Sequence, residues 1–286
     1  MSKREGGLQI RRILVALDSS RHSLAAMEAA AELAAHTEAE LLGLFVEDIN
    51  LLRLARLPFV SQVSSTSMAE ESVDSTRMGR ELRAQAEQAR RALEAVAGRA
   101  RVPWSFRVAR GEVATEVLAA AEEADLLTLG KRGLALNGRR LGSTACAALT
   151  NVRRSVLLSQ HGFPLLQTLL VVYDGSEGSR QALDVALRLA RAGGRRLIAL
   201  RVSEAATADD IQNEAASVMG SKGPPVRCQG PYSANAISLS HALRREAEGL
   251  LVLSDAGLLS RDEIQKLLQQ IRNPVLLIAG VVAEAA

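Results

Sequence analysis

The stretch that decides the fold runs from Ile13 to Asp48 and reads ILVALDSSRHSLAAMEAAAELAAHTEAELLGLFVED. A second stretch, from Leu169 to Glu204, reads LLVVYDGSEGSRQALDVALRLARAGGRRLIALRVSE and aligns with the first at a constant offset of 156, without a gap. Twelve of the 36 aligned positions are identical, and some of them lie in the apolar runs on both sides of the helical part. Chance similarity between two helices would not extend into those flanking runs, so we interpret the pair as a tandem duplication. We place the two related domains at residues 9–161 and 166–286.

Each copy alternates short apolar runs with helical patterns. In the first copy the runs RILVAL, LLGLFV, WSFRV, LLTLG and SVLLS are typical of strands buried on both faces of a parallel sheet. Between the runs, alanines and leucines recur at helical spacing, and Ser20 and Ser176 precede two of these helices as candidate N-caps. The polar stretch VSSTSMAEESVDS, Val63 to Ser75, is predicted to be a loop. This alternation predicts an α/β fold with two tandem doubly wound parallel-sheet domains.

Composition narrows the class of protein. The chain has 286 residues, 48% of them hydrophobic, and a net charge of +3, which is typical of a globular protein and does not require a nucleic-acid partner. No apolar run approaches the roughly 20 residues needed to cross a bilayer, and the polar N-terminus has no signal-like core. The two cysteines, Cys146 and Cys228, have no metal-ligand spacing. We therefore expect a cytoplasmic protein without a membrane or nucleic-acid partner.

A glycine-rich stretch lies between a predicted strand and a predicted helix, where doubly wound sheets bind ligands. It reads LTLGKRGLALNGRRLGSTACAAL, from Leu127 to Leu149. Glycines let backbone approach a phosphate, and the N-terminus of the following helix carries partial positive charge. Cationic side chains in the stretch would neutralise the anion. We predict a phosphate site in this stretch, to which Lys131, Arg132, Ser143 and Thr144 would contribute together with glycine backbone.

Several motifs make the chain resemble the universal stress protein family, in its tandem two-domain form. The similar stretches are ILVALDSS at the start, GEVATEVLAAAEEADLLTLGKRG from Gly111, and GSTACAALTNVRRSVLLS from Gly142. The resemblance implies a Rossmann-like fold and binding of an adenine nucleotide, with Asp18 on the ribose or adenine side. It also implies that Gly130, Gly133, Gly142 and Ser143 surround the phosphate. The adenine edge would meet exposed backbone near Val46. Only eight residues separate Gly133 from Gly142, one fewer than in the family's nucleotide-binding pattern.

The second copy lacks the glycine pattern. Asp255 stands where Lys131 stands in the first copy, Gly257 is the glycine that remains, and no Gly-Ser pair follows. An acidic side chain at this place would repel phosphate. We expect the second copy to be structural and to pack on the first as a second subunit would in a dimer.

The sequence favours a stress-response regulator or protective factor that binds ATP, with or without Mg²⁺, or a related adenine nucleotide. No general base is placed by sequence, so we expect at most slow ATP hydrolysis. The alternative is an interaction scaffold of the same fold, in which the shortened loop has closed the site. An adenylating enzyme is disfavoured because LDSSRHS replaces the expected SGGxDS-like loop. The protein partner and the choice between a monomer and a homodimer are left open.

Overall fold

The computed structural model describes residues 10–18, 20–54, 61–63, 70–72, 75–131, 141–151, 153–160, 167–204, 206–220, 224–246 and 248–280. Within these ranges the elements of the first copy are β1 (Arg12–Leu17), α1 (Arg21–Thr37), β2 (Glu40–Asp48), α2 (Ile49–Leu54), β3 (Ser61–Val63), β4 (Glu70–Ser72), α3 (Ser75–Ala100), β5 (Trp104–Gly111), α4 (Val113–Ala121), β6 (Leu126–Gly130), α5 (Ser143–Asn151) and β7 (Ser155–Ser159). Those of the second copy are β8 (Thr168–Tyr173), α6 (Glu177–Gly193), β9 (Arg196–Arg201), α7 (Ala208–Met219), β10 (Val226–Gln229), α8 (Ala236–Arg245), β11 (Leu250–Ser254), α9 (Arg261–Gln270) and β12 (Val275–Ile278).

The two copies share one sheet, whose described strands follow the order β10-β9-β8-β11-β12-β7-β6-β1-β2-β5. Neighbouring strands inside each copy are parallel, and each copy has its first strand in the middle with the second and third on one side and the fourth and fifth on the other. The copies meet through β7 and β12, which pair antiparallel from Val156–Leu277 to Leu158–Val275. The predicted fold class, two tandem doubly wound domains, is confirmed. The domain boundaries at 161 and 166 fall outside the described residues and remain predictions.

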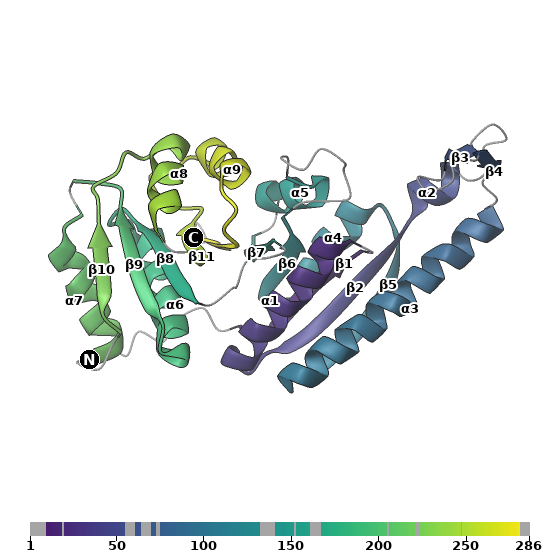
Figure 1. The fold of residues 1–286 in the computed structure, drawn as a ribbon, viewed down its shortest axis with the longest axis horizontal. Helices are drawn as coiled ribbons and strands as arrows, with labels where there is room; N and C mark the ends of the chain where they lie inside the picture. The colour runs from purple at the N-terminus through teal and green to yellow at the C-terminus, as the bar shows by residue number, and fades with distance from the viewer. Residues whose placement is uncertain are drawn as a thin grey trace, which may run out of the picture.

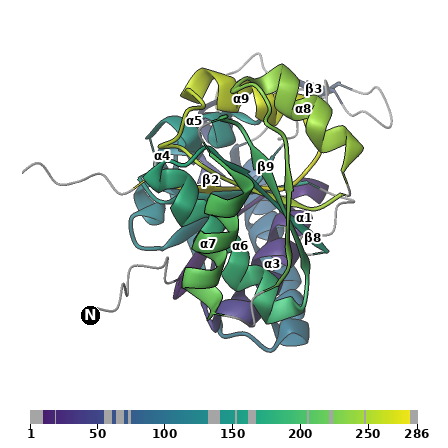
Figure 2. The ribbon, with the colours of Figure 1, turned by 90° about the vertical axis from the view of Figure 1, so that its left-hand side faces the viewer.

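Helices cover both faces of the sheet, and each face has its own core. One core lies under α1, α3, α6 and α7 and includes Leu33, Leu93 and Leu183, all fully buried. The other lies under α4, α5, α8 and α9 and includes Val117, Leu239 and Leu267. Figure 1 shows the two copies side by side, and Figure 2 shows α8 and α9 on one side of the strands with α6 and α7 on the other. The near-continuous apolar runs of the sequence follow from this double burial.

Local sequence explains where the first helix of each copy begins and ends. Ser20 accepts a hydrogen bond from the Ser23 amide at 3.2 Å, and Ser176 accepts one from the Ser179 amide at the same distance, so both predicted N-caps are confirmed. Both helices end at equivalent positions in the left-handed conformation, at Glu38 (φ 56°) and at Gly194 (φ 62°). A left-handed C-terminal position favours glycine because it has no Cβ, so only the second copy carries the residue that this geometry prefers.

The segment between β2 and β5, which is longer than its counterpart between β9 and β10, contains structure that the sequence did not predict. The polar stretch from Val63 to Ser75 is predicted to be a loop, and this is wrong at three places. Val63 ends β3, residues 70–72 form β4 and pair antiparallel with β3, and Ser75 begins α3. A hairpin held by backbone hydrogen bonds needs no apolar alternation, so the pattern of side chains gave no signal. Figure 1 shows α2, this hairpin and the start of α3 projecting from one end of the molecule.

Candidate functional site

The predicted site lies at the carboxyl ends of β1 and β6, which are neighbours in the sheet. The helix that follows β1 packs on one face, and α5, which follows β6, packs on the opposite face. Chain direction therefore diverges at the carboxyl ends of these two strands, which is the place where doubly wound sheets bind ligands. We call this place the crevice of the first copy. Asp18 borders this crevice directly after β1, and Gly130 borders it as the last residue of β6.

Asp18 is exposed and held by local hydrogen bonds. Its amide donates to the Ser23 hydroxyl at 3.0 Å, and its Oδ1 accepts the Ser20 amide at 2.9 Å. Beside it, β2 continues past the last residue paired with β1, so Val46 to Asp48 pair with β5 and have no β1 partner. The Val46 side chain is buried in the core against α4. The structure thus brings Asp18 next to the last three residues of β2, whose backbone is not paired on the side of β1.

The glycine stretch is described at its two ends. Gly142 donates its amide to the Lys131 carbonyl at 3.3 Å, and its own carbonyl accepts the Cys146 amide at 2.9 Å as α5 begins. This brings the start of α5, with exposed Ser143 and partly buried Thr144, next to the end of β6. Free amides of a first helical turn attract anions. Gly133 and Arg132 lie outside the described residues, so their predicted contacts stay predictions.

Gly130 has a packing role that the sequence did not reveal. A Cβ at this position would lie 2.9 Å from the Cβ of His22 and 3.2 Å from its carbonyl carbon, both on α1. Real side chains do not come this close without a shift of the neighbour. The glycine therefore allows the end of β6 to approach α1, whatever ligand the crevice binds. Its predicted contact with phosphate stays a prediction beside this structural role.

Lys131 lies in a different environment from the one expected for an exposed phosphate ligand. Its side chain is 1% exposed, and its Nζ donates to the carbonyl oxygens of Ile271 at 2.8 Å and Asn273 at 3.3 Å. Both acceptors belong to the turn between α9 and β12 in the second copy. The predicted phosphate contact of Lys131 is thus untested, whereas its contact with the second copy is present in the structure.

In the second copy the connection after β11 lies against the equivalent place at the end of β8. Asp174, the counterpart of Asp18, accepts the Leu258 amide on Oδ2 at 2.6 Å and the Ser176 amide on Oδ1 at 2.8 Å. Gly257 lies against the same carboxylate. Burial raises the pKa of Asp174, but the hydrogen bonds from Ser176 and Leu258 outweigh it, and the net pKa is lowered. The connection after β11 therefore covers the end of β8, and the Leu258 amide in this connection already donates to the Asp174 carboxylate.

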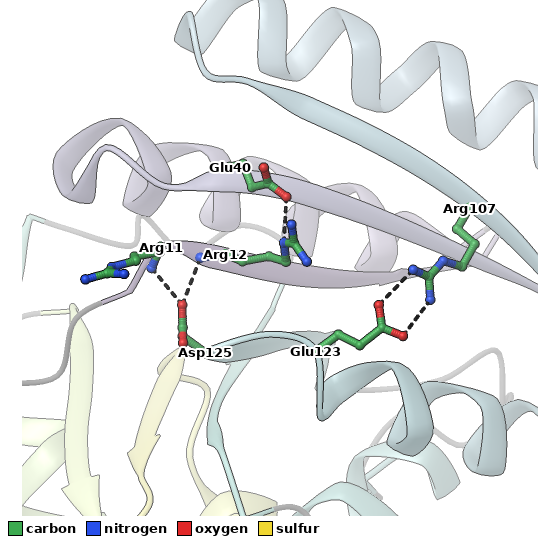
Figure 3. Close-up of polar contacts among 6 residues, drawn as sticks. All are labelled: Arg11, Arg12, Glu40, Arg107, Glu123 and Asp125. Atoms are coloured by element: carbon green, nitrogen blue, oxygen red, sulfur yellow. Dashed lines mark hydrogen bonds and ion pairs between the residues drawn. The ribbon is translucent and has the colours of Figure 1, made fainter.

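A group of charged residues of the first copy lies at the other end of the strands from this crevice. Figure 3 shows Arg11 and Arg12 donating their backbone amides to Asp125, and Arg107 facing Glu123, around the start of β1 and the end of α4. The Arg107 guanidinium lowers the pKa of Glu123. Since ligands bind at the opposite, carboxyl ends of the strands, we interpret these pairs as structural. Among the described residues no group of three or more His, Cys, Asp or Glu could hold a metal ion.

The fold and the crevice define a class: a doubly wound α/β protein in which two copies share one sheet. The family model for the universal stress protein family matches residues 9–160 and 166–223, so the chain belongs to the universal stress protein family. No helix within the described part of the chain is long and apolar enough to cross a membrane. No curated protein sequence matches the chain significantly.

Solved structures share this architecture over almost the whole chain. A universal stress protein from Archaeoglobus fulgidus DSM 4304 is 20% identical, with a TM-score of 0.66, over 94% of this chain and 98% of that one. A protein of unknown function from Pseudomonas aeruginosa PAO1 is 15% identical, with a TM-score of 0.56, over 94% and 92%. A putative universal stress protein from Pseudomonas aeruginosa UCBPP-PA14 is also 15% identical, with a TM-score of 0.54, over 94% and 93%. At these identities the likeness shows the fold alone.

Proposed function

We propose that the first copy binds ATP, with or without Mg²⁺, or a related adenine nucleotide, and that the protein acts in the cytoplasm as a stress-response regulator or protective factor. The observation that carries this proposal is the contrast between two equivalent aspartates. Asp18 is exposed at the crevice of the first copy, whereas Asp174 is partly buried and hydrogen-bonded to the Leu258 amide. An exposed carboxylate beside a helix N-terminus suits a ligand with hydroxyl groups at one end and phosphates at the other.

Each part of the nucleotide has a candidate partner. The Asp18 carboxylate would accept hydrogen bonds from ribose hydroxyls, and the backbone edge from Val46 onward would meet the adenine. The amides of Gly142, Ser143 and Thr144 would donate to phosphate oxygens. Gly133 and Arg132, outside the described residues, complete the predicted phosphate site together with Gly130.

The sharpest test uses Asp18→Ala with Asp174→Ala as its matched control. Loss of a charge-assisted hydrogen bond of about 1.5–3 kcal/mol would weaken ATP binding about 10- to 100-fold in Asp18→Ala. Asp174→Ala should leave the affinity unchanged because the connection after β11 covers the equivalent place in the second copy. Calorimetric titration, with and without Mg²⁺, measures both, and mass spectrometry of the denatured wild type identifies any nucleotide carried through purification. Absence of bound nucleotide together with absence of titratable heat would refute the proposal.

A second candidate is a scaffold of the same fold that binds a protein partner and no nucleotide. Lys131 favours it, since its ammonium group contacts the second copy and the loop that it begins is one residue shorter than the family pattern. Equal behaviour of the two aspartate variants in titration, combined with no released nucleotide, would select this candidate. Turnover is not part of either proposal, because neither the sequence nor the described crevice places a general base beside a phosphate.

A further inference from the structure

We propose that Lys131 is a positioning residue that couples the base of the glycine loop in the first copy to the α9–β12 turn in the second. Three features meet at this residue. Its carbonyl accepts the Gly142 amide, its own amide donates to the Ser159 carbonyl at 2.7 Å, and its Nζ donates to two carbonyls of the second copy. One residue thus connects the end of β6, the start of α5 and a turn 140 residues away.

The sheet topology makes this contact available. Since β7 and β12 run antiparallel, the amino end of β12 lies beside the carboxyl end of β7, where Val275 pairs with Leu158. Lys131 follows β6, the other neighbour of β7, so its extended side chain needs to pass only one strand to reach the turn. A buried ammonium group is strongly disfavoured without acceptors, which holds the lysine to the carbonyls of Ile271 and Asn273.

Lys131 of the first copy contacts the second copy, but among the described residues its counterpart Asp255 makes no equivalent hydrogen bond to the first copy. The equivalent residue of the second copy, Asp255, cannot donate to carbonyls of the first, and its Oδ1 instead accepts the Gly280 amide at 2.6 Å within its own copy. Asp255 and Lys131 otherwise occupy matching places, because the Asp255 amide donates to the Ile278 carbonyl as the Lys131 amide does to Ser159. The asymmetry gives the second copy a direct contact with the base of the loop in the first copy, with no counterpart from Asp255.

The turn itself is fixed from the second copy. Asn273 is 8% exposed, and its Nδ2 donates to the Gly249 carbonyl at 2.9 Å. Asn273→Ala would release this bond and loosen the turn without touching the first copy. If Lys131 transmits the position of the turn, the first turn of α5 must respond to this change, and the response must disappear when Lys131 cannot donate.

The experiment is a double-mutant cycle read by hydrogen–deuterium exchange on the full chain. We expect Asn273→Ala to raise exchange at the amides of Gly142 to Cys146 several-fold in the wild-type background and to add nothing in a Lys131→Met background. Lys266→Met, at an exposed lysine on α9, is the control and should leave these amides unchanged. Unchanged exchange in Asn273→Ala, or equal increases in both backgrounds, would overturn the coupling. If Lys131→Met does not fold, Lys131→Leu takes its place in the cycle, and unchanged exchange in Asn273→Ala alone still overturns the coupling.

A second arm, which rests on the proposed function, measures ATP affinity in the same variants. Coupling between the turn and the loop predicts that Asn273→Ala weakens ATP binding about fivefold or more, and that it has no further effect once Lys131→Met is present. Equal weakening in both backgrounds would contradict Lys131 as the link. If the wild type binds no ATP, the proposed function fails, and the exchange measurements still decide the coupling.

Discussion

Both copies contain one close contact between a strand and a helix, but the glycine that allows it lies on the strand in the first copy and on the helix in the second. The end of β6 lies against the first turn of α1, and the end of β11 lies against the first turn of α6. Each of these contacts is too close for two side chains. In the first copy the strand contributes Gly130 and the helix contributes His22, whereas in the second copy the strand contributes Ser254 and the helix contributes Gly178. The shared requirement is one glycine per contact, and either side satisfies it. A glycine in this loop is therefore not by itself a sign of a phosphate site.

The largest expected effect comes from adding a Cβ to these glycines. In Gly178→Ala the new atom would lie 2.5 Å from the Ser254 hydroxyl and 2.6 Å from the Ala256 carbonyl oxygen, so backbone must move. We expect a loss of about 3 kcal/mol in the free energy of unfolding, measured by chemical denaturation. In Gly130→Ala the neighbours are His22 Cβ and its backbone at 2.9 Å and beyond, and we expect about 2 kcal/mol.

A swap of the pair tests whether the contact explains the glycine. Gly130→Ser gives the first copy the strand residue of the second, and the added change His22→Gly gives it the helix residue as well. We expect the double variant to recover at least half of the stability lost in Gly130→Ser. Independent, additive losses from the two changes would show that the reciprocal contact is not the reason for the glycine.

A smaller loss of stability is expected from replacing Asp174, and a still smaller one from replacing Asp18. In Asp174→Asn an amide hydrogen would face either the Leu258 or the Ser176 amide, both of which need an acceptor. We expect a loss of about 1 kcal/mol at neutral pH, since partial exposure screens the carboxylate. Asp18→Asn should lose less stability, because Asp18 accepts the amide of nearby Ser20, whereas Asp174 accepts the Leu258 amide in addition to the equivalent local one.

The effect of Asp174→Asn should depend on pH in a defined direction. The pKa of Asp174 is lowered in the folded state, so its carboxylate stabilises the fold above the ordinary value near 4 and stops doing so as the pH falls through the folded pKa. The difference in the free energy of unfolding between wild type and Asp174→Asn should therefore shrink as the pH falls from about 5 through the folded pKa. A difference that stays constant over this range would show that the charge on Asp174 is not what holds the Leu258 connection.

The last comparison concerns the C-terminal ends of α1 and α6, where Glu38→Gly has the smallest expected effect. Glu38 adopts a left-handed conformation that its counterpart Gly194 adopts without a steric penalty. Glu38→Gly should raise the free energy of unfolding by about 0.5 kcal/mol, and Gly194→Ala should lower it by about 1 kcal/mol. Thermal unfolding of both variants measures the pair. A loss of stability in Glu38→Gly would mean that contacts of the Glu38 side chain outweigh the strain.

The amino-acid sequence by itself determined the duplication, the strands RILVAL, LLTLG and SVLLS at their observed bounds, and the two serine N-caps. These follow from burial and from hydrogen bonds between residues close in the chain, which leave a periodic pattern. It also indicated that the second copy differs after its fourth strand, because Asp255 replaces a lysine. The hairpin in the polar excursion left no such pattern and was missed.

Only the tertiary structure decided which distant residues Gly130 and Lys131 contact. The sequence grouped Gly130 and Lys131 as phosphate residues because they are adjacent in a familiar motif. The structure shows that Gly130 packs against His22 and that Lys131 reaches Ile271 and Asn273. These contacts depend on strand order and on the antiparallel pairing of β7 with β12, which join residues more than a hundred positions apart. Periodicity records which face of an element is buried, but it does not record which distant residue covers it.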